Sequence, residues 1–278
     1  MYRVGVVVLN YINYSETVNC VNSILIQDYP DLRIVIVDNG SNNESETILR
    51  ETFETYKNVS LLAVEKNLGF AKGNNVGINF LRKEGCEFVL VINSDIIFSE
   101  KDIISHGISE WEDGVGLVNF PTNRSNGVEE CRTKFSKKYL RLRIIKQLLI
   151  VEFKYMFHIG KNQKKGTANT DSAEITNTTK TASNTTTTKR DINEYVVTGC
   201  AYGLTPSYFN KYDKLYDRTF LYFEEDALII QLHVGHLDTM QVGTAPLIHK
   251  HGASSDNVRT DIARQSARIV LRMAILGK

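Results

Sequence analysis

The sequence predicts an α/β fold with a mostly parallel central sheet and flanking helices. Apolar runs rich in Val and Ile occur at residues 4–9, at 32–37 with Arg33 as the one charged residue, and at 88–92. Such runs are typical of strands buried on both faces. Between them, apolar residues recur at the spacing of an α-helix. Strands that alternate with helices form βαβ units, whose ligand sites lie at the carboxyl ends of the strands.

The elements of the first half follow this alternation in order. Residues 10–13 break the first strand, and the helix that begins after Ser15 ends before Pro30. We then expect a strand at 32–37, a helix at 44–56, a strand at 59–64, a helix at 70–81, and strands at 87–92 and 115–120.

A basic segment begins the less regular second half. Residues 132–165 contain eleven Lys or Arg and one acidic residue, Glu152, interleaved with apolar residues, which predicts a cationic amphipathic helix. This helix either packs its apolar face on the core or makes a peripheral membrane contact. Residues 166–190 are rich in Thr, Asn and Ser and almost free of large apolar residues, so we expect a disordered loop.

The rest of the chain returns to regular structure. We expect a strand with embedded glycines at 194–204, a helix from Pro206, a helix at 220–234, a strand at 239–249 and an amphipathic helix at 258–278. In the last helix, Arg264, Arg268 and Arg272 form one basic stripe. Contact with anionic lipid and an ordinary amphipathic terminal helix both remain open interpretations of this stripe.

Composition narrows the class of protein. The 278 residues contain 33 Lys and Arg against 32 Asp and Glu, so no overall charge favours nucleic acid, and we expect no nucleic-acid partner. The four cysteines are far apart and form no Cys-x-x-Cys pair, which argues against a zinc ribbon or a disulfide framework and fits a reducing cytoplasm. No leader pattern and no long apolar run occurs, so we expect neither export nor a membrane span.

Polar residues occupy four places at the ends of predicted strands or just before helices. They are Asn10 with Tyr11, Asp38, the segment 67–75, and the turn of Asn93, Ser94 and Asp95. Asp38 is placed to accept hydrogen bonds from a base or ribose, and Asp95 can hold a hard divalent cation. An Asx-turn or a plain turn is the competing interpretation of each.

The segment 67–75 is suited to bind phosphate. Gly69 and Gly73 allow close approach of the backbone, and Lys72 adds a positive charge at a helix N-terminus. A plain helix cap is the alternative. The spacing is not that of a Walker motif.

Two further groups could do chemistry. The adjacent carboxylates of Glu224, Glu225 and Asp226 raise one another's pKa, as a general base requires, although a solvated helix N-terminus would show the same residues. His249 follows a strand, where a nearby Asp would make it a metal ligand rather than a structural His.

The order of these motifs resembles that of the family 2 glycosyltransferases with the GT-A fold. The resemblance covers roughly residues 2–120 and 194–255, and rhamnosyltransferase-like and other polysaccharide-assembly members are most similar. It rests on the segments 4–13, 27–30, 34–41, 67–75 and 93–95, on Thr198-Gly-Cys-Ala, on the Glu-Glu-Asp cluster, and on the ending from His249 to Ser254.

The resemblance implies a nucleotide-diphosphate sugar donor, a divalent cation (Mn²⁺ or Mg²⁺), and a single displacement that inverts the anomeric carbon. Asp38 would then hold the base or ribose. The other donor-binding residues would be Asn10, Tyr11, Asn67, Gly69, Lys72, Asn74, Asn75, Asn93, Ser94 and Glu224. Because Asn93 stands where the family's Asp-x-Asp motif has its first Asp, the metal ligands would be Asp95 and His249.

Glu225 would be the base that deprotonates the acceptor hydroxyl, and Asp226 takes this role if the alignment shifts by one residue. We therefore expect an inverting glycosyltransferase that acts on a polysaccharide or lipid-linked saccharide. The alternative is a non-catalytic scaffold that keeps the nucleotide-sugar fold, whereas a nucleotidyltransferase would need a glycine-rich signature that the N-terminus lacks.

The domain expectation is one GT-A domain over residues 1–278. Its parts are a nucleotide-sugar-binding half (1–120), a basic amphipathic segment (121–165), a disordered insertion (166–192), an acceptor and catalytic half (193–257) and a C-terminal helix (258–278). The expected location is the cytoplasm, with a peripheral contact to the inner face of the cell membrane left open.

Overall fold

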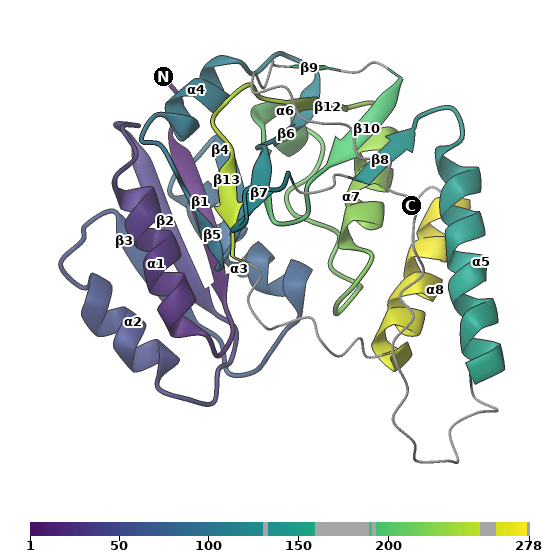
Figure 1. Cartoon of the computed structure of the whole chain (residues 1–278), viewed down its shortest axis with the longest axis horizontal. Coiled ribbons are helices and arrows are strands. Elements are labelled where there is room, and N and C mark those ends of the chain that lie inside the picture. Colours follow the sequence, from purple (N-terminus) through teal and green to yellow (C-terminus); the bar gives the residue numbers. More distant parts are fainter. Residues whose placement is uncertain (130–132, 159–188, 191–192, 251–259, 277–278) are drawn as a thin grey trace.

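The computed structural model describes residues 1–129, 133–158, 189–190, 193–250 and 260–276, and its centre is an eight-stranded sheet (Figure 1). The strand order is β3-β2-β1-β4-β11-β6-β12-β9. In chain order these strands are β1 (Val4–Asn10), β2 (Leu32–Asp38), β3 (Val59–Ala63), β4 (Phe88–Asn93), β6 (Val115–Asn119), β9 (Lys189–Arg190), β11 (Ala201–Leu204) and β12 (Asp238–Gln241).

The strands of the first half are parallel. β1 pairs with β2 on one side and β4 on the other, and β2 pairs with β3. β6 and β12 are also parallel, whereas β11 lies antiparallel between β4 and β6, and β9 is an antiparallel edge strand. The predicted α/β class with a mostly parallel central sheet is confirmed.

Helices cover both faces of this sheet, because successive side chains of a strand point to opposite faces. Val6 and Val8 of β1 lie in the buried cluster that includes residues of α1, α2 and α4, and Val7 lies in the cluster that includes residues of α3, α7 and α8. The helices are α1 (Tyr14–Leu25), α2 (Ser45–Phe53), α3 (Phe70–Lys83), α4 (Ile103–Ser109), α5 (Leu140–His158), α6 (Pro206–Phe209), α7 (Glu224–Val234) and α8 (Thr260–Leu276).

Strand β1 lies at the topological switch point of the sheet. The chain passes from β1 to β2 and β3 on one side, and then returns to β4 on the other. Open α/β sheets bind ligands in the crevice outside the carboxyl ends of the strands at such a point. Gly73 and Gly77 let α3 pack closely on β1, since a Cβ there would lie 2.7 Å from a Leu9 methyl and 2.6 Å from a Val7 methyl.

Two small sheets complete the fold. One has the order β5-β13-β7, and the other pairs β10 with β8. Their strands are β5 (Ile96–Ile97), β7 (Thr122–Arg124), β8 (Thr133–Ser136), β10 (Glu194–Val197) and β13 (Leu247–His249).

The structure corrects several predicted elements of the second half. The single strand expected at 239–249 is two strands, β12 and β13, which belong to different sheets, and the strand expected at 194–204 is likewise β10 and β11. The helix expected at 220–234 begins only at Glu224, because Tyr222 and Phe223 have φ values of 73° and 65°, outside the helical region. The start of the predicted basic helix is strand β8, and α4, β5 and β7 had no predicted counterpart.

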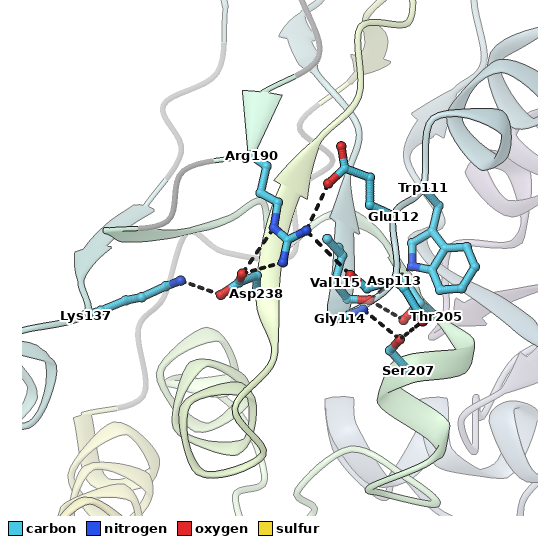
Figure 2. Close-up of polar contacts among 10 residues, drawn as sticks. All are labelled: Trp111, Glu112, Asp113, Gly114, Val115, Lys137, Arg190, Thr205, Ser207 and Asp238. Carbon is cyan, nitrogen blue, oxygen red and sulfur yellow. Dashed lines mark hydrogen bonds and ion pairs between the residues drawn. The ribbon is translucent and has the colours of Figure 1, made fainter.

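The prediction of a disordered insertion is wrong at its C-terminal end, because Lys189 and Arg190 form strand β9. Residues 166–188 lie outside the described chain. Arg190 donates from Nη2 and Nε to Asp238 Oδ2, at 2.8 and 3.1 Å, and from Nη1 to Glu112 Oε2, at 2.9 Å (Figure 2). Lys137 Nζ pairs with the other Asp238 oxygen. These ion pairs hold the edge strand to β12 and to the loop before β6.

The same end of β6 is held by neutral hydrogen bonds (Figure 2). Thr205 Oγ1 and Trp111 Nε1 both donate to the carbonyl of Val115, at 2.6 and 3.1 Å. Ser207 Oγ accepts from Gly114 N at 3.3 Å and donates to Asp113 Oδ1, also at 3.3 Å. The N-terminus of α6 is thereby joined to the start of β6.

The predicted C-terminal helix is present as α8, and it packs against α5 (Figure 1). Glu152 on α5 accepts hydrogen bonds from Arg264 Nε at 2.9 Å and from Arg268 Nε at 2.6 Å. Two arginines of the basic stripe thus face α5, which corrects the interpretation of the whole stripe as a lipid contact. Within the described chain, no helix combines the length and apolar character needed to cross a membrane.

Candidate active site at the switch point

Three strand ends meet at the switch point. Asn10 at the end of β1 lies opposite Asp38 of β2, and Leu9 lies opposite Asn93 of β4. The sequence prediction that Asn10, Asp38 and Asn93 share one edge is therefore confirmed.

The carboxylate of Asp38 is buried and held by its own chain. Its Oδ1 accepts from Asn10 Nδ2 and from Ser41 Oγ, both at 2.6 Å, and its Oδ2 accepts from Ser41 N at 3.2 Å. Thr17 Oγ1 donates to Asn10 Oδ1 at 2.7 Å, which fixes the amide of Asn10. The turn predicted as the alternative role of Asp38 is present, and Tyr11 lies next to it as an exposed side chain.

The loop before α3 is tied to the end of β2 by Asn39. Asn39 Nδ2 donates to Asn67 Oδ1 at 3.1 Å, and Asn39 Oδ1 accepts from Leu68 N at 3.0 Å. Gly69 has φ 85°, and a Cβ there would lie 2.1 Å from the carbonyl oxygen of Phe220. This position therefore requires glycine for both its conformation and its close contact.

Three predicted donor-binding residues of α3 lie differently. Lys72 is exposed, and the buried Asn74 donates to the carbonyl of Phe70 within its own helix. Asn75 donates to Leu215 O and accepts from Leu215 N, both at 2.9 Å. The polar atoms of the Asn75 side chain are thus engaged by the backbone of the loop that precedes α7.

Asp95 and His249 lie side by side although 154 positions of sequence separate them. Strand β13 pairs with β5 so that His249 is opposite Ile96, and His249 Nε2 is 3.3 Å from Asp95 Oδ2. Both side chains are mostly buried, and Lys250 N donates to the carbonyl of Asp95 at 3.0 Å. The ending that runs on to Ser254 lies outside the described residues.

This pair fits a divalent cation whose remaining coordination positions are filled by phosphate oxygens of a substrate. Mg²⁺-type sites commonly use one or two carboxylates and fill the remaining positions with phosphate oxygens and water. Among the described residues, no third His, Cys, Asp or Glu joins the pair. Asp95 and His249 would therefore hold such an ion only together with a phosphate-bearing ligand.

The acidic cluster lies in the first turn of α7, where Asp226 is buried and Glu224 and Glu225 are half-buried rather than fully solvated. Burial, followed by the charge of Glu225, raises the pKa of Glu224 to about 7 and that of Asp226 to about 7. Burial also raises the pKa of Glu225. The predicted direction is confirmed, but burial contributes more than the mutual repulsion that the sequence suggested.

A cavity of about 400 Å³ extends from the acidic cluster to His249 of the Asp95–His249 pair. Glu224 and Glu225 line it together with Asn93 and His249. Its other lining residues are Phe70, Val197, Thr198, Gly199, Cys200, Tyr202, Leu221, Tyr222 and Leu228. Asp226 does not belong to this lining, so Glu225 is the better placed of the two candidate bases.

Sequence reasoning missed several members of this site. Asn39 and Ser41 lie in the motif 34–41, and Gly199 lies in the motif Thr198-Gly-Cys-Ala, but their residue types alone indicate no role for them. A Cβ at Gly199 would lie 2.0 Å from Glu225 Oε1, so the missing side chain makes room for the carboxylate. Phe70 and Tyr202 are apolar lining residues that no local pattern distinguishes from core residues.

Fold and site together define an α/β protein with an enzyme-like acid–base cavity at its switch point. The chain belongs to glycosyl transferase family 2: residues 4–172, more than half of its length, match the sequence model of that family. It is also 32% identical over 100 residues to glycosyltransferase GlyG of Streptococcus pneumoniae serotype 4. That match covers 36% of this chain and only about a third (32%) of the relative.

Solved structures support the fold. S. aureus TarS 1-349 in complex with UDP-GlcNAc has a TM-score of 0.60 and 14% identity, over 99% of this chain and 66% of that chain. The mannosyltransferase PcManGT from Pyrobaculum calidifontis, in complex with GDP-Man and Mn²⁺, has a TM-score of 0.58 and 12% identity, over 99% of this chain and 74% of that chain. This likeness confirms the predicted GT-A fold class.

Proposed function

We propose that this chain is an inverting glycosyltransferase that moves a sugar from a nucleotide-diphosphate sugar to a hydroxyl of a polysaccharide or lipid-linked saccharide. The observation that carries the proposal is the convergence of Glu225, Asn93 and His249 on one cavity at the switch point. TarS with UDP-GlcNAc and PcManGT with GDP-Man are neighbours of the same fold, which supports a donor of this class.

The donor half of the proposed site is the edge formed by β1, β2 and the loop before α3. Asp38 and Asn10 would orient the base or ribose, with Tyr11 beside them, because their side chains are fixed by hydrogen bonds before any ligand arrives. The diphosphate would lie toward Asn93, Ser94 and the Asp95–His249 pair, near the start of α3. A preorganised pocket of this kind lowers the ordering cost of binding.

The acceptor half of the proposed site is the cavity beside α7. Glu225 would accept the proton of the acceptor hydroxyl as that oxygen attacks the anomeric carbon from the face opposite the nucleotide. Its raised pKa makes it a stronger base than an ordinary carboxylate. Attack from the opposite face in a single step inverts the anomeric configuration.

Asp95 and His249 would hold a divalent cation, Mn²⁺ or Mg²⁺, next to the diphosphate. When bound, such an ion offsets the negative charge that develops on the leaving nucleotide. The Mn²⁺ in the PcManGT complex supports this part of the proposal.

Substitution of the two candidate bases tests the proposal. Glu225→Gln should lower turnover by about 10²- to 10⁴-fold with donor affinity retained, whereas Asp226→Asn should retain turnover within about tenfold. Donor affinity is measured by calorimetry and turnover by nucleotide release. If Asp226→Asn alone abolishes turnover, the assignment of the base is wrong.

A scaffold function is the second candidate, because Asn93 replaces a carboxylate at the cavity. A thermal-shift screen of UDP-, GDP- and dTDP-sugars with and without Mn²⁺ first identifies the donor, since a bound ligand stabilises the folded state. Wild-type protein that binds this donor but releases no nucleotide with any saccharide acceptor would favour the scaffold. For the enzyme, we propose the cytoplasm as location, where a lipid-linked acceptor would lie at the inner face of the membrane.

A further inference from the structure

Helix α5 carries an apolar face that the described parts of the chain leave exposed. Leu142, Leu149 and Ile150 are 66%, 54% and 46% exposed, and Tyr139, one residue before the helix, is 56% exposed. At 3.6 residues per turn these four side chains fall within a sector of about 100°. They form one stripe along the outside of the helix.

The core-facing side of α5 lies opposite this stripe. Leu140 and Ile144 are fully buried in the hydrophobic core, together with Val270 of α8. Figure 1 shows α5 at the edge of the molecule, with α8 on its inner side. A helix at the edge of a globular protein normally has one apolar stripe, which faces the core. A second stripe of large apolar side chains is typical of a surface that something else covers.

Cationic side chains accompany the exposed stripe. Lys138 and Lys146 are exposed. Lys146 lies within the angular range of the apolar residues, and Lys138 lies about 20° outside it. Glu152 is the one acidic residue between 132 and 165, and its carboxylate is bound by Arg264 and Arg268 on α8. The positive charge of this face is therefore not offset by its own segment.

We propose that the α5 surface, defined as Tyr139, Leu142, Lys146, Leu149 and Ile150, docks on a lipid bilayer that carries anionic headgroups. Apolar side chains with interspersed Lys and Arg are the pattern of helices that lie in the plane of a membrane interface. The apolar stripe enters the headgroup boundary, and the long cationic side chains reach the phosphates.

The other occupants of this surface fit less well. A second copy related by a two-fold axis would place the same cations against one another. The segment 159–188 contains only two large aliphatic residues, Ile159 and Ile175, and no aromatic residue, so its sequence offers little apolar area to cover the stripe. An anionic bilayer matches both the apolar and the charged part.

Sedimentation with lipid vesicles tests the inference on the full chain. We expect it to bind phosphatidylcholine vesicles that contain phosphatidylglycerol, to bind pure phosphatidylcholine weakly, and to dissociate at high salt. Leu142→Gln with Leu149→Gln should lower the partition coefficient by about tenfold or more, and Lys146→Gln by about fivefold. The matched control is Ile26→Gln, which changes an aliphatic side chain that is 63% exposed on another face.

Three outcomes would overturn the inference: the wild type stays in the supernatant with anionic vesicles at low salt, the α5 variants bind as well as the wild type, or Ile26→Gln weakens binding equally. A dimer in light scattering that Leu142→Gln with Leu149→Gln dissociates, without vesicle binding, would assign the surface to a second copy instead. Circular dichroism verifies that each variant is folded. The inference deepens, and rests on, the proposed function with a lipid-linked acceptor at the inner face of the membrane. Because no donor or acceptor is added, its failure is distinguishable from failure of sugar transfer.

Discussion

Gly199 leaves the space that the carboxylate of Glu225 occupies, since a Cβ at position 199 would lie 2.0 Å from Glu225 Oε1. The two residues come from different elements, the turn between β10 and β11 and the first turn of α7. The direction in which Glu225 points is therefore set by the absence of a side chain across the cavity.

Gly199→Ala should displace the Glu225 carboxylate and lower kcat by about 10- to 100-fold, because small misplacements of a reacting group are costly. The KM for the donor should change little, since the donor half of the site is not touched. Steady-state kinetics measure both constants, and a conservative variant on the same turn, Thr198→Ser, is the control. A kcat equal to that of the wild type would show that Glu225 does not need this position.

The raised pKa values make stability depend on pH. Glu224 has a pKa of about 7 when folded, against an ordinary value of 4.5, so the unfolded state releases its proton first as the pH rises. Stability from this group is complete below about pH 4.5 and is lost as the pH rises through about 7. We expect Glu224→Gln to remove about 2 kcal/mol of the fall in unfolding free energy between pH 5 and pH 8. Urea denaturation at pH 5 and pH 8 measures the unfolding free energies of both proteins. An equal fall in the wild type and in Glu224→Gln would contradict the raised pKa of Glu224.

Removal of one carboxylate from the Asp95–His249 pair should weaken cation binding. Asp95→Asn is expected to lower the affinity for Mn²⁺, measured calorimetrically in the presence of UDP or GDP, by at least about tenfold. Asp102→Asn, an exposed carboxylate elsewhere, is the control. Equal affinities for the wild type and Asp95→Asn would remove Asp95 from the site.

Asn75 distinguishes a structural from a donor-binding role. Asn75→Ala leaves the backbone N–H and C=O of Leu215 without their partner, which should lower the unfolding free energy by about 2 kcal/mol. If the role is structural, the donor Kd of the folded protein changes by less than about threefold. A large loss of donor affinity with unchanged stability would restore Asn75 to the donor site.

The regular part of the fold was readable from the sequence because most of its strands, β1, β2, β4 and β6, are buried on both faces. A short run of Val and Ile such as 34–37 fits a buried strand better than any other element. The positions of these strands were therefore predicted within a residue or two. The second half has shorter strands, and β12 and β13 read as one run although they pair in different sheets. The limits of such short strands depend on which strands they pair with, and the local sequence pattern carries no information about this pairing.

The site was predictable where residues stand at strand ends, as with Asn10, Asp38 and Asp95. It was not predictable where long-range contacts decide. The bonds of Asn75 to Leu215 join residues more than a hundred positions apart. The proximity of His249 to Asp95, through the pairing of β13 with β5, is equally long-range, and it was expected only because of the resemblance to the family 2 glycosyltransferases. Tyr222 and Phe223, both at positive φ before Glu224, likewise carry no signal of that conformation in their residue types.

The place of β11 between β4 and β6 has a consequence for biosynthesis. The ribosome releases β4 about a hundred residues before β11, its permanent neighbour on that side. Until residue 204 emerges, the backbone of β4 is therefore unpaired on that side. Unpaired strand edges promote aggregation. Truncated versions that stop near residue 120 should consequently accumulate in inclusion bodies rather than yield an autonomous nucleotide-binding fragment.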